Sequence, residues 1–158
     1  MEKQKKIAII GLGYVGLPLA IAFSEFYQVC GFDVNSTRIS ELNNSIDSNG
    51  DVIVSINDKL DFTDDEKKLT SSNIFIVTVP TPVTPNNIPD LSILENATRM
   101  IAKYISKGDI VIYESTVYPG VTEEICVPIL EEGSGLKYNF DFYCGYSPER
   151  ISPGADKY

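Results

Sequence analysis

The 158-residue sequence contains no histidine and no tryptophan. The missing imidazole excludes a histidine general acid or base, and histidine metal ligands, within this chain. Basic residues are few: 13 Lys and Arg stand against 22 Asp and Glu, for a net charge of −9. This charge argues against nucleic acid as a partner, because binding its phosphate backbone needs a basic face. A small anionic ligand stays compatible with it, because backbone N–H groups bind anions without cationic side chains.

Cysteines and long apolar runs are also scarce. The three cysteines, Cys30, Cys126 and Cys144, are widely spaced, so the sequence predicts neither a metal site nor a disulfide framework. We interpret them as partly buried thiols of a cytoplasmic protein. No apolar run approaches the roughly 18 residues of a membrane-spanning helix. The charged start, followed by Gly11 and Gly13, is also unlike a signal peptide. We therefore expect no membrane partner.

The length predicts one domain over residues 1–158. Short apolar runs, typical of buried strands, alternate with segments of helical periodicity. Predicted strands cover residues 6–10, 28–32, 60–62, 73–79, 109–113 and 140–145. Predicted helices cover residues 14–26, 36–42, 64–69, 90–106 and 122–130. This alternation predicts an α/β fold, a Rossmann-type doubly wound and mainly parallel sheet with helices on both faces.

Local patterns add detail to these elements. Apolar side chains recur on one face of the first helix, which we expect to be buried: Val15, Leu19, Ala22, Phe23 and Phe26. Pro128 predicts that the helix at 122–130 is strained or shortened, and the glycines at 133–135 predict a turn. The polar residues 43–59 predict a loop, and the proline-rich segment 81–89 predicts irregular chain.

Gly11, Gly13 and Gly16 form a G-x-G-x-x-G motif between the first predicted strand and the first predicted helix. Gly11 allows a tight turn, Gly13 lets a pyrophosphate approach the backbone, and Gly16 lets the helix pack closely on the strand. The helix start offers free N–H groups and the positive end of its dipole to phosphates. The motif in this context predicts a dinucleotide site that needs no basic side chain.

Asp33 lies 22 residues after Gly11, directly after the second predicted strand. A carboxylate at this place accepts hydrogen bonds from the adenosine ribose and repels a 2′-phosphate, so we expect NAD rather than NADP. Arg38 has two interpretations between which spacing does not decide. It contacts the adenosine end of the cofactor, or it sits on the helix surface.

Three further predicted strands end in unusual segments. In an open parallel sheet, ligands bind outside the carboxyl ends of the strands. A hydroxyl facing the cofactor or an ordered water is one interpretation of Thr81 and of Thr116, and turn chemistry is the other. The turn is favoured for Thr81, and the two interpretations balance for Thr116. Glu149 follows the last strand and is placed for general acid–base catalysis, although a loop glutamate is more often only solvated.

Five segments together resemble the UDP-glucose/GDP-mannose dehydrogenase family. They lie at 9–20 (IIGLGYVGLPLA), 31–35 (GFDVN), 79–82 (VPTP), 114–120 (ESTVYPG) and 145–151 (GYSPERI). Their order and their spread over nearly the whole chain make the resemblance specific. Within the family the bacterial UDP-N-acetylhexosamine branch is most similar, including the Vi-polysaccharide type of UDP-N-acetylglucosamine/galactosamine dehydrogenase.

The resemblance implies the N-terminal, NAD-binding part of a longer nucleotide-sugar 6-dehydrogenase. Such enzymes oxidise the C6 alcohol of a UDP-sugar, here a UDP-N-acetylhexosamine, to a carboxylate with two NAD, for surface polysaccharide synthesis. The NAD contacts it implies come from Tyr14, Val15, Asp33, Arg38, Thr81 and Thr116. It also implies that Thr116 orders the reacting water and that Glu149 is the acid–base residue.

The family's nucleophilic cysteine, which carries the thiohemiacetal and thioester, is implied to lie beyond this chain. The catalytic lysine, the UDP-sugar domain and the helix that builds a homodimer are implied to lie there too. None of the three cysteines has the nucleophile's sequence setting, so we expect the chain alone to be inactive. Two departures stand out: Pro153 occupies the place of a second family glutamate, and the polar stretch between Asn43 and Leu60 is shorter than in relatives.

Two other functions are compatible with the glycine motif alone. A β-hydroxyacid-type dehydrogenase also begins with a GLG fingerprint, and a sensing module would bind NAD without catalysis. The segments at 114–120 and 145–151 argue against the β-hydroxyacid type. They also argue against a sensing module, because a sensor needs no acid–base groups at the nicotinamide end of its cofactor.

Overall fold

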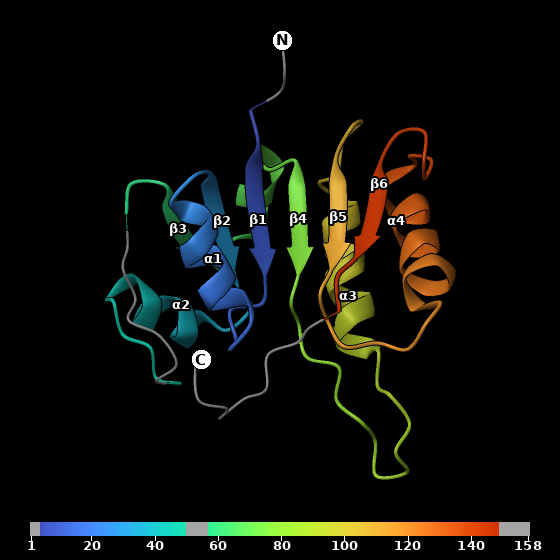
Figure 1. Cartoon of the computed structure of the whole chain (residues 1–158), viewed down its shortest axis with the longest axis horizontal. Coiled ribbons are helices and arrows are strands. Elements are labelled where there is room, and N and C mark those ends of the chain that lie inside the picture. Colours follow the sequence, from blue (N-terminus) through green and yellow to red (C-terminus); the bar gives the residue numbers. More distant parts are fainter. Residues whose placement is uncertain (1–3, 50–56, 149–158) are drawn as a thin grey trace.

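The computed structural model describes residues 4–49 and 57–148. Six strands form one sheet in the order β3-β2-β1-β4-β5-β6, and all neighbouring strands are parallel (Figure 1). They are β1 (Lys6–Ile10), β2 (Gln28–Phe32), β3 (Leu60–Thr63), β4 (Ile74–Val77), β5 (Ile110–Tyr113) and β6 (Tyr143–Tyr146). The predicted Rossmann-type α/β fold is therefore confirmed.

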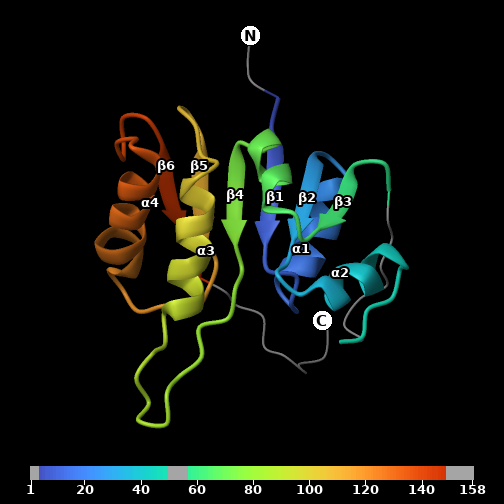
Figure 2. The ribbon, with the colours of Figure 1, turned by 180° about the vertical axis from the view of Figure 1, so that it is seen from behind.

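Helices cover both faces of the sheet. Helices α1 (Gly16–Ser24) and α2 (Ser36–Asn43) lie on one face, and α3 (Ser92–Ala102) and α4 (Val127–Ser134) lie on the other (Figures 1 and 2). The strand order reverses between β1 and β4, so right-handed crossovers place the two pairs of helices on opposite faces. The carboxyl ends of all six strands meet at one edge, and a ligand crevice is expected at this reversal.

Strand β1 shows how the alternation of side chains builds two cores. Ile7 and Ile9 pack with the residues of α1 and α2, whereas Ala8 and Ile10 pack with those of α3 and α4. All four side chains are buried. The strand is apolar on both faces because helices cover both faces, as in other parallel sheets.

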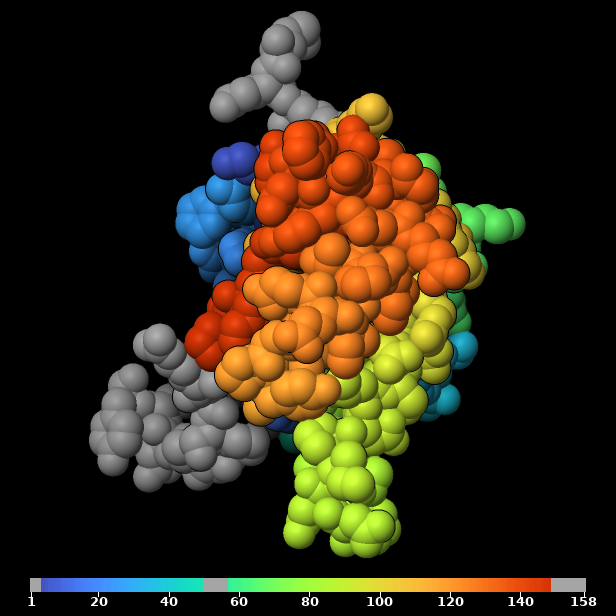
Figure 3. All heavy atoms as spheres, turned by 90° about the vertical axis from the view of Figure 1, so that its right-hand side faces the viewer, coloured from blue at the N-terminus to red at the C-terminus, as the bar shows by residue number. Residues whose placement is uncertain are grey.

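The segment between β4 and α3 contains the proline-rich residues 81–89 and projects beyond the carboxyl edge (Figures 1 and 3). Val83 and Pro89 form an isolated antiparallel bridge, and Thr84 N donates to the Ile88 carbonyl at 2.8 Å. The prediction of irregular chain is right in that neither a helix nor a strand forms here.

The buried face predicted for the first helix is only partly right, because Val15 is buried and Leu19 and Phe23 pack partly buried against the core. Ala22 is exposed and Phe26, beyond the end of α1, is 73% exposed. The buried residues of α1 are instead Gly16, Leu17, Ala20 and Ser24. Gly16 approaches the Gly11 carbonyl closely, so small residues form part of the buried face, and the apolar pattern does not mark them.

The last predicted helix is present, but it is not shortened at Pro128. A π-helical turn, η2 (Thr122–Cys126), comes first, and Pro128 stands at the start of α4, where its missing N–H costs little. The predicted turn at 133–135 is instead the helix end, because Gly133 and Ser134 belong to α4 and Gly135 caps it with φ of 70°.

The predicted third strand is confirmed as β3, and a 3₁₀ helix, η1 (Glu66–Ser71), follows it. Within residues 4–49 and 57–148, none of the helices is long and apolar enough to cross a membrane.

Candidate functional site

A cleft of about 970 Å³ opens at the carboxyl edge of the sheet, where the strand order reverses. Its walls come from the loop after β1, the end of β2, the loop after β4, the end of β5 and one side of α3. Of the residues singled out from the sequence, these line it: Gly11, Gly13, Tyr14, Val15, Asp33, Thr81 and Thr116. The fold thus brings segments more than 100 residues apart in sequence to one place.

The glycine loop forms the wall nearest α1. Gly11 has φ of 95°, a conformation that disfavours other residues. A Cβ on Gly16 would overlap the carbonyl oxygen of Gly11 and lie 2.5 Å from the Thr78 hydroxyl. A Cβ on Gly13 would meet no atom within 4 Å. Gly16 is therefore needed for packing, and Gly13 leaves the open backbone that an approaching pyrophosphate requires.

The cleft offers backbone amide groups to an anion, rather than cationic side chains. None of the residues that line it in the described part of the chain is lysine or arginine, and Asp33, Glu66 and Glu114 are acidic. The first hydrogen bond of α1 runs from Leu17 N to the Gly13 carbonyl at 3.1 Å, so the amides before it are not used within the helix. These amides and the helix dipole suit a bound pyrophosphate.

Thr78, which the sequence analysis missed, supports the loop from β4. Its hydroxyl lies 2.7 Å from the Gly11 carbonyl oxygen and 3.1 Å from that of Ile10, and it donates to the nearer one. A threonine at the end of a buried strand was the available signal, but its partner lies 67 residues away.

Asp33 binds the glycine loop directly. Its Oδ2 accepts from Leu12 N at 2.8 Å and its Oδ1 accepts from Asn35 N at 2.9 Å. The carboxylate lines the cleft and is only partly buried. Because each carboxylate oxygen has two acceptor positions, both retain capacity for a ligand hydroxyl.

Arg38 lies in neither simple position. It is 8% exposed, so the surface interpretation is wrong, and it does not line the cleft. Its Nε donates to the Leu12 carbonyl at 3.1 Å, and its Nη1 forms an ion pair with Asp47 Oδ1 at 2.7 Å. Among the described residues, neither its buried Nη1 nor its buried Nη2 has a hydrogen-bond partner, so the contact with Asp47 is an ion pair. Asp47 is a second residue that the sequence analysis missed, because it lies in a polar segment without a motif.

Two loops on the other side of the cleft are tied together by hydroxyls. Thr81 Oγ1 donates to the Thr116 carbonyl, and Ser115 Oγ donates to the Val79 carbonyl at 2.6 Å. The bond of Thr81 joins two loops that are 35 residues apart in sequence, so it is not the local turn chemistry favoured from the sequence. Thr116 is exposed in the cleft. Glu149, the predicted acid–base residue, lies outside the described residues.

The three thiols lack the properties of a nucleophile. Burial raises the pKa of Cys30 to about 11 and that of Cys144 to about 12, and it also raises the pKa of Cys126. All three are free cysteines. Because the thiolate is the reactive form, these thiols are protonated and unreactive near neutral pH.

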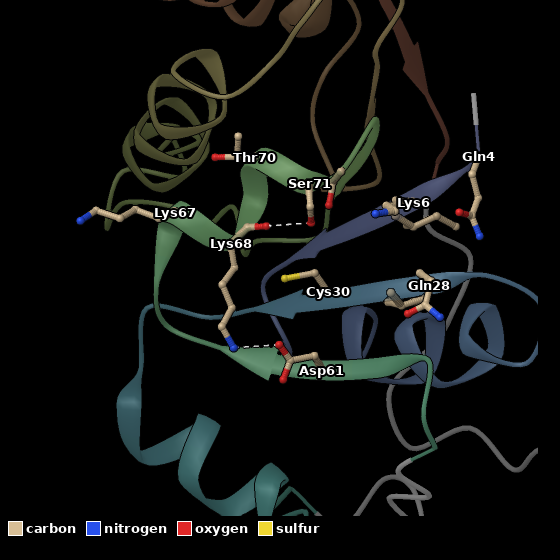
Figure 4. Close-up of a pocket in the computed structure, with 12 residues that line it drawn as sticks. Gln4, Lys6, Gln28, Cys30, Asp61, Lys67, Lys68, Thr70 and Ser71 are labelled. Atoms are coloured by element: carbon tan, nitrogen blue, oxygen red, sulfur yellow. Dashed lines mark hydrogen bonds and ion pairs between the residues drawn. The ribbon is translucent and has the colours of Figure 1, made fainter. Parts of the chain in front are cut away.

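A second groove of about 780 Å³ lies near the amino ends of β1 and β2. Figure 4 shows Cys30 of β2 and Asp61 of β3 there, beside Lys68 and Ser71 of η1. Lys68 Nζ and Asp61 Oδ2 form an ion pair at 2.8 Å, and both side chains are exposed. None of the residues singled out as site candidates from the sequence lines this groove.

Comparisons with known proteins agree with this geometry. Residues 5–158 match the NAD-binding domain of the UDP-glucose/GDP-mannose dehydrogenase family. The chain is 54% identical over 155 residues to UDP-N-acetyl-D-glucosamine 6-dehydrogenase of Pseudomonas aeruginosa, covering 96% of the chain and 37% of that relative. It is 53% identical over 158 residues to the Salmonella typhi enzyme of the same name, covering 98% and 37%.

Solved structures give the same result. A UDP-D-ManNAc dehydrogenase from Pyrococcus horikoshii superposes with a TM-score of 0.84 at 39% identity, over 94% of this chain and 37% of that one. A ternary complex of GDP-mannose dehydrogenase from Pseudomonas aeruginosa gives a TM-score of 0.82 at 30% identity, over 93% and 36%. The chain therefore spans little more than a third of the length of these relatives.

Proposed function

Because the chain belongs to the UDP-glucose/GDP-mannose dehydrogenase family and forms its NAD-binding domain, we propose that it is the NAD-binding half of a nucleotide-sugar 6-dehydrogenase. The proposed reaction oxidises the C6 alcohol of a UDP-N-acetylhexosamine to a carboxylate and reduces two NAD, for surface polysaccharide synthesis. The observation that carries the proposal is the single cleft in which the glycine loop, Asp33 and the β4 and β5 loops meet. Bound NAD supplies the hydride acceptor.

We assign the glycine loop to the pyrophosphate. Gly11 and Gly13, with Tyr14 and Val15, present the open backbone and the start of α1 to this group, and Gly16 allows the close packing behind them. The chain's net charge of −9 does not oppose such binding, because the backbone amides supply the local positive potential.

The two ends of the cofactor are assigned to opposite sides of the cleft. Asp33 accepts hydrogen bonds from the adenosine ribose, and Arg38 supports the loop from beneath through Leu12. Thr81 and Thr116 line the side of the cleft that is assigned to the nicotinamide. There Thr116 is also assigned to order the reacting water.

Residues beyond residue 158 complete the proposed enzyme. The two relatives are covered only to 37% of their length, so the UDP-sugar domain, the nucleophile and the homodimer contacts are proposed to follow in sequence. Glu149 is the proposed acid–base residue, residues 1–158 are the proposed cofactor domain, and the whole protein is proposed to work in the cytoplasm.

Cofactor binding is tested on the 158-residue chain by titration calorimetry with NAD. We expect saturable 1:1 binding, and we expect Asp33→Asn to weaken it by about tenfold, since a hydrogen bond to a charged group is lost. The matched control is Asp58→Asn, an exposed loop carboxylate outside the cleft. Absence of heat at millimolar NAD in a folded chain would reject the assignment.

The activity is tested with the full-length protein and UDP-N-acetylglucosamine. We expect two NADH per uronate formed, whereas the 158-residue chain under the same conditions produces none. Uronate formation by the 158-residue chain would contradict the proposal that the nucleophile lies outside residues 1–158. NAD binding without turnover in the full-length protein would favour a sensing role.

A further inference from the structure

A buried ion pair lies directly behind the glycine loop. Arg38 of α2 and Asp47, in the polar segment after α2, approach to 2.7 Å between Nη1 and Oδ1. Their side chains are 8% and 2% exposed. Burying two charges is costly unless they are paired, so each side chain depends on the other for its charge to stay buried. The pair therefore differs from a solvated ion pair at the surface.

Leu12 joins this ion pair to the carboxylate of Asp33, the side chain assigned to the adenosine ribose. Arg38 Nε donates to the Leu12 carbonyl at 3.1 Å, and Leu12 N donates to Asp33 Oδ2 at 2.8 Å. The path Asp47–Arg38–Leu12–Asp33 therefore runs without a gap from the polar segment to the cleft. Movement of the Arg38 guanidinium would change the position of the Leu12 peptide and, with it, the Asp33 carboxylate.

A second carboxylate faces the same guanidinium at a longer distance. Glu41 Oε2 lies 3.9 Å from Arg38 Nη1, and it accepts a hydrogen bond from Ser48 Oγ at 2.7 Å. The Glu41 side chain is 31% exposed, against 2% for Asp47. Asp47 is therefore the main counter-charge of Arg38, because attraction is stronger at short distance and in a drier site.

We propose that Asp47 is a specificity-determining, positioning residue that favours NAD over NADP by neutralising Arg38. Arginine is the side chain that commonly accommodates a 2′-phosphate in related sites. Arg38 stands within two hydrogen bonds of Asp33, at the proposed ribose end of the cleft, so an unpaired Arg38 would attract that phosphate. Held by Asp47, it is neither free nor exposed. This inference rests on the proposed NAD site.

The test compares the dissociation constants of NAD and NADP for the 158-residue chain and for Asp47→Asn, which keeps the shape of the side chain and removes its charge. We expect NAD binding to weaken by a few fold and the preference for NAD over NADP to fall by about tenfold. A purely structural role would weaken both cofactors in parallel and leave their ratio unchanged, and this result would overturn the inference.

Two further variants keep the test decisive. Glu41→Gln removes the more distant carboxylate and is expected to leave the ratio within about twofold, since that charge is longer-range and more exposed. Arg38→Met removes the cation and is expected to weaken NAD with no gain for NADP. If Asp47→Asn fails to fold by circular dichroism, unchanged NAD binding in Arg38→Met would overturn the inference. A folded wild-type chain that binds neither cofactor would instead reject the proposed function itself.

Discussion

The two halves of the sheet hold their sides of the cleft by different chemistry. In the β1–β3 half, charged side chains hold the glycine loop, together with the Thr78 hydroxyl that reaches it from the end of β4. Asp33 accepts from the Leu12 amide at 2.8 Å, and Arg38 donates to the Leu12 carbonyl at 3.1 Å. A buried ion pair with Asp47 then holds Arg38 itself.

In the β4–β6 half, neutral hydroxyl groups hold the loops in place. Ser115 donates to the Val79 carbonyl, and Thr81 donates to that of Thr116. Hydrogen bonds to ions are stronger and costlier to leave unpaired than those of hydroxyls. The comparison therefore predicts a rigid, charge-dependent glycine loop opposite loops that tolerate substitution better.

The largest expected effect comes from a glycine pair within the first half. In Gly16→Ala, the new Cβ would overlap the Gly11 carbonyl, and we expect a loss of about 3 kcal/mol in the free energy of unfolding. In Gly13→Ala, no atom lies within 4 Å of the new Cβ, so we expect near-normal stability but at least tenfold weaker NAD binding. Urea unfolding and calorimetry separate the two. Equal destabilisation by both variants would contradict the division into packing and binding glycines.

A smaller effect is expected in the second half. Thr81→Val removes the hydroxyl that donates to the Thr116 carbonyl, and we expect a loss of about 1 kcal/mol by urea unfolding. Thr116→Val removes a hydroxyl that this bond does not use, so we expect a stability change within about 0.5 kcal/mol. A several-fold weaker NAD affinity in Thr116→Val alone would identify its hydroxyl as a ligand contact. A larger loss of stability in Thr116→Val than in Thr81→Val would show that the hydroxyl bond does not join the loops.

The smallest effect at neutral pH concerns one thiol from each half. Burial raises the folded-state pKa of Cys30 to about 11 and of Cys144 to about 12, from 9.0. Above pH ~9 the unfolded chain loses these protons and the folded chain retains them, so stability is full below ~9 and falls as the pH rises toward 11. We expect little alkylation of the folded chain by iodoacetamide at pH 7.5 and a decline in stability above pH 9. The decline should be smaller in the double variant Cys30→Ser/Cys144→Ser. Rapid alkylation at pH 7.5 would show accessible thiolates.

Local signals were reliable where a function depends on neighbouring residues. The G-x-G-x-x-G spacing, the strand before it and Asp33 were sufficient to predict the loop, its turn at Gly11 and the carboxylate in the cleft. They were insufficient for Arg38, because its partners are a carbonyl 26 residues away and a carboxylate in a segment without a motif. Thr78 was missed for the same reason, since its partner lies 67 residues away.

The sequence by itself determined the alternation of strands and helices, the parallel α/β class and the glycine loop, because period, spacing and turn chemistry are properties of adjacent residues. Tertiary structure alone decided which face of α1 is buried, how Pro128 is accommodated and where Arg38 points. Each of these depends on how one element is rotated and placed against another. The composition lacks histidine and is poor in cations. Among the described residues, the cleft is lined by the glycine loop and by no lysine or arginine, and Arg38 is paired with Asp47 behind that loop, because the fold places α2 and the segment after it there.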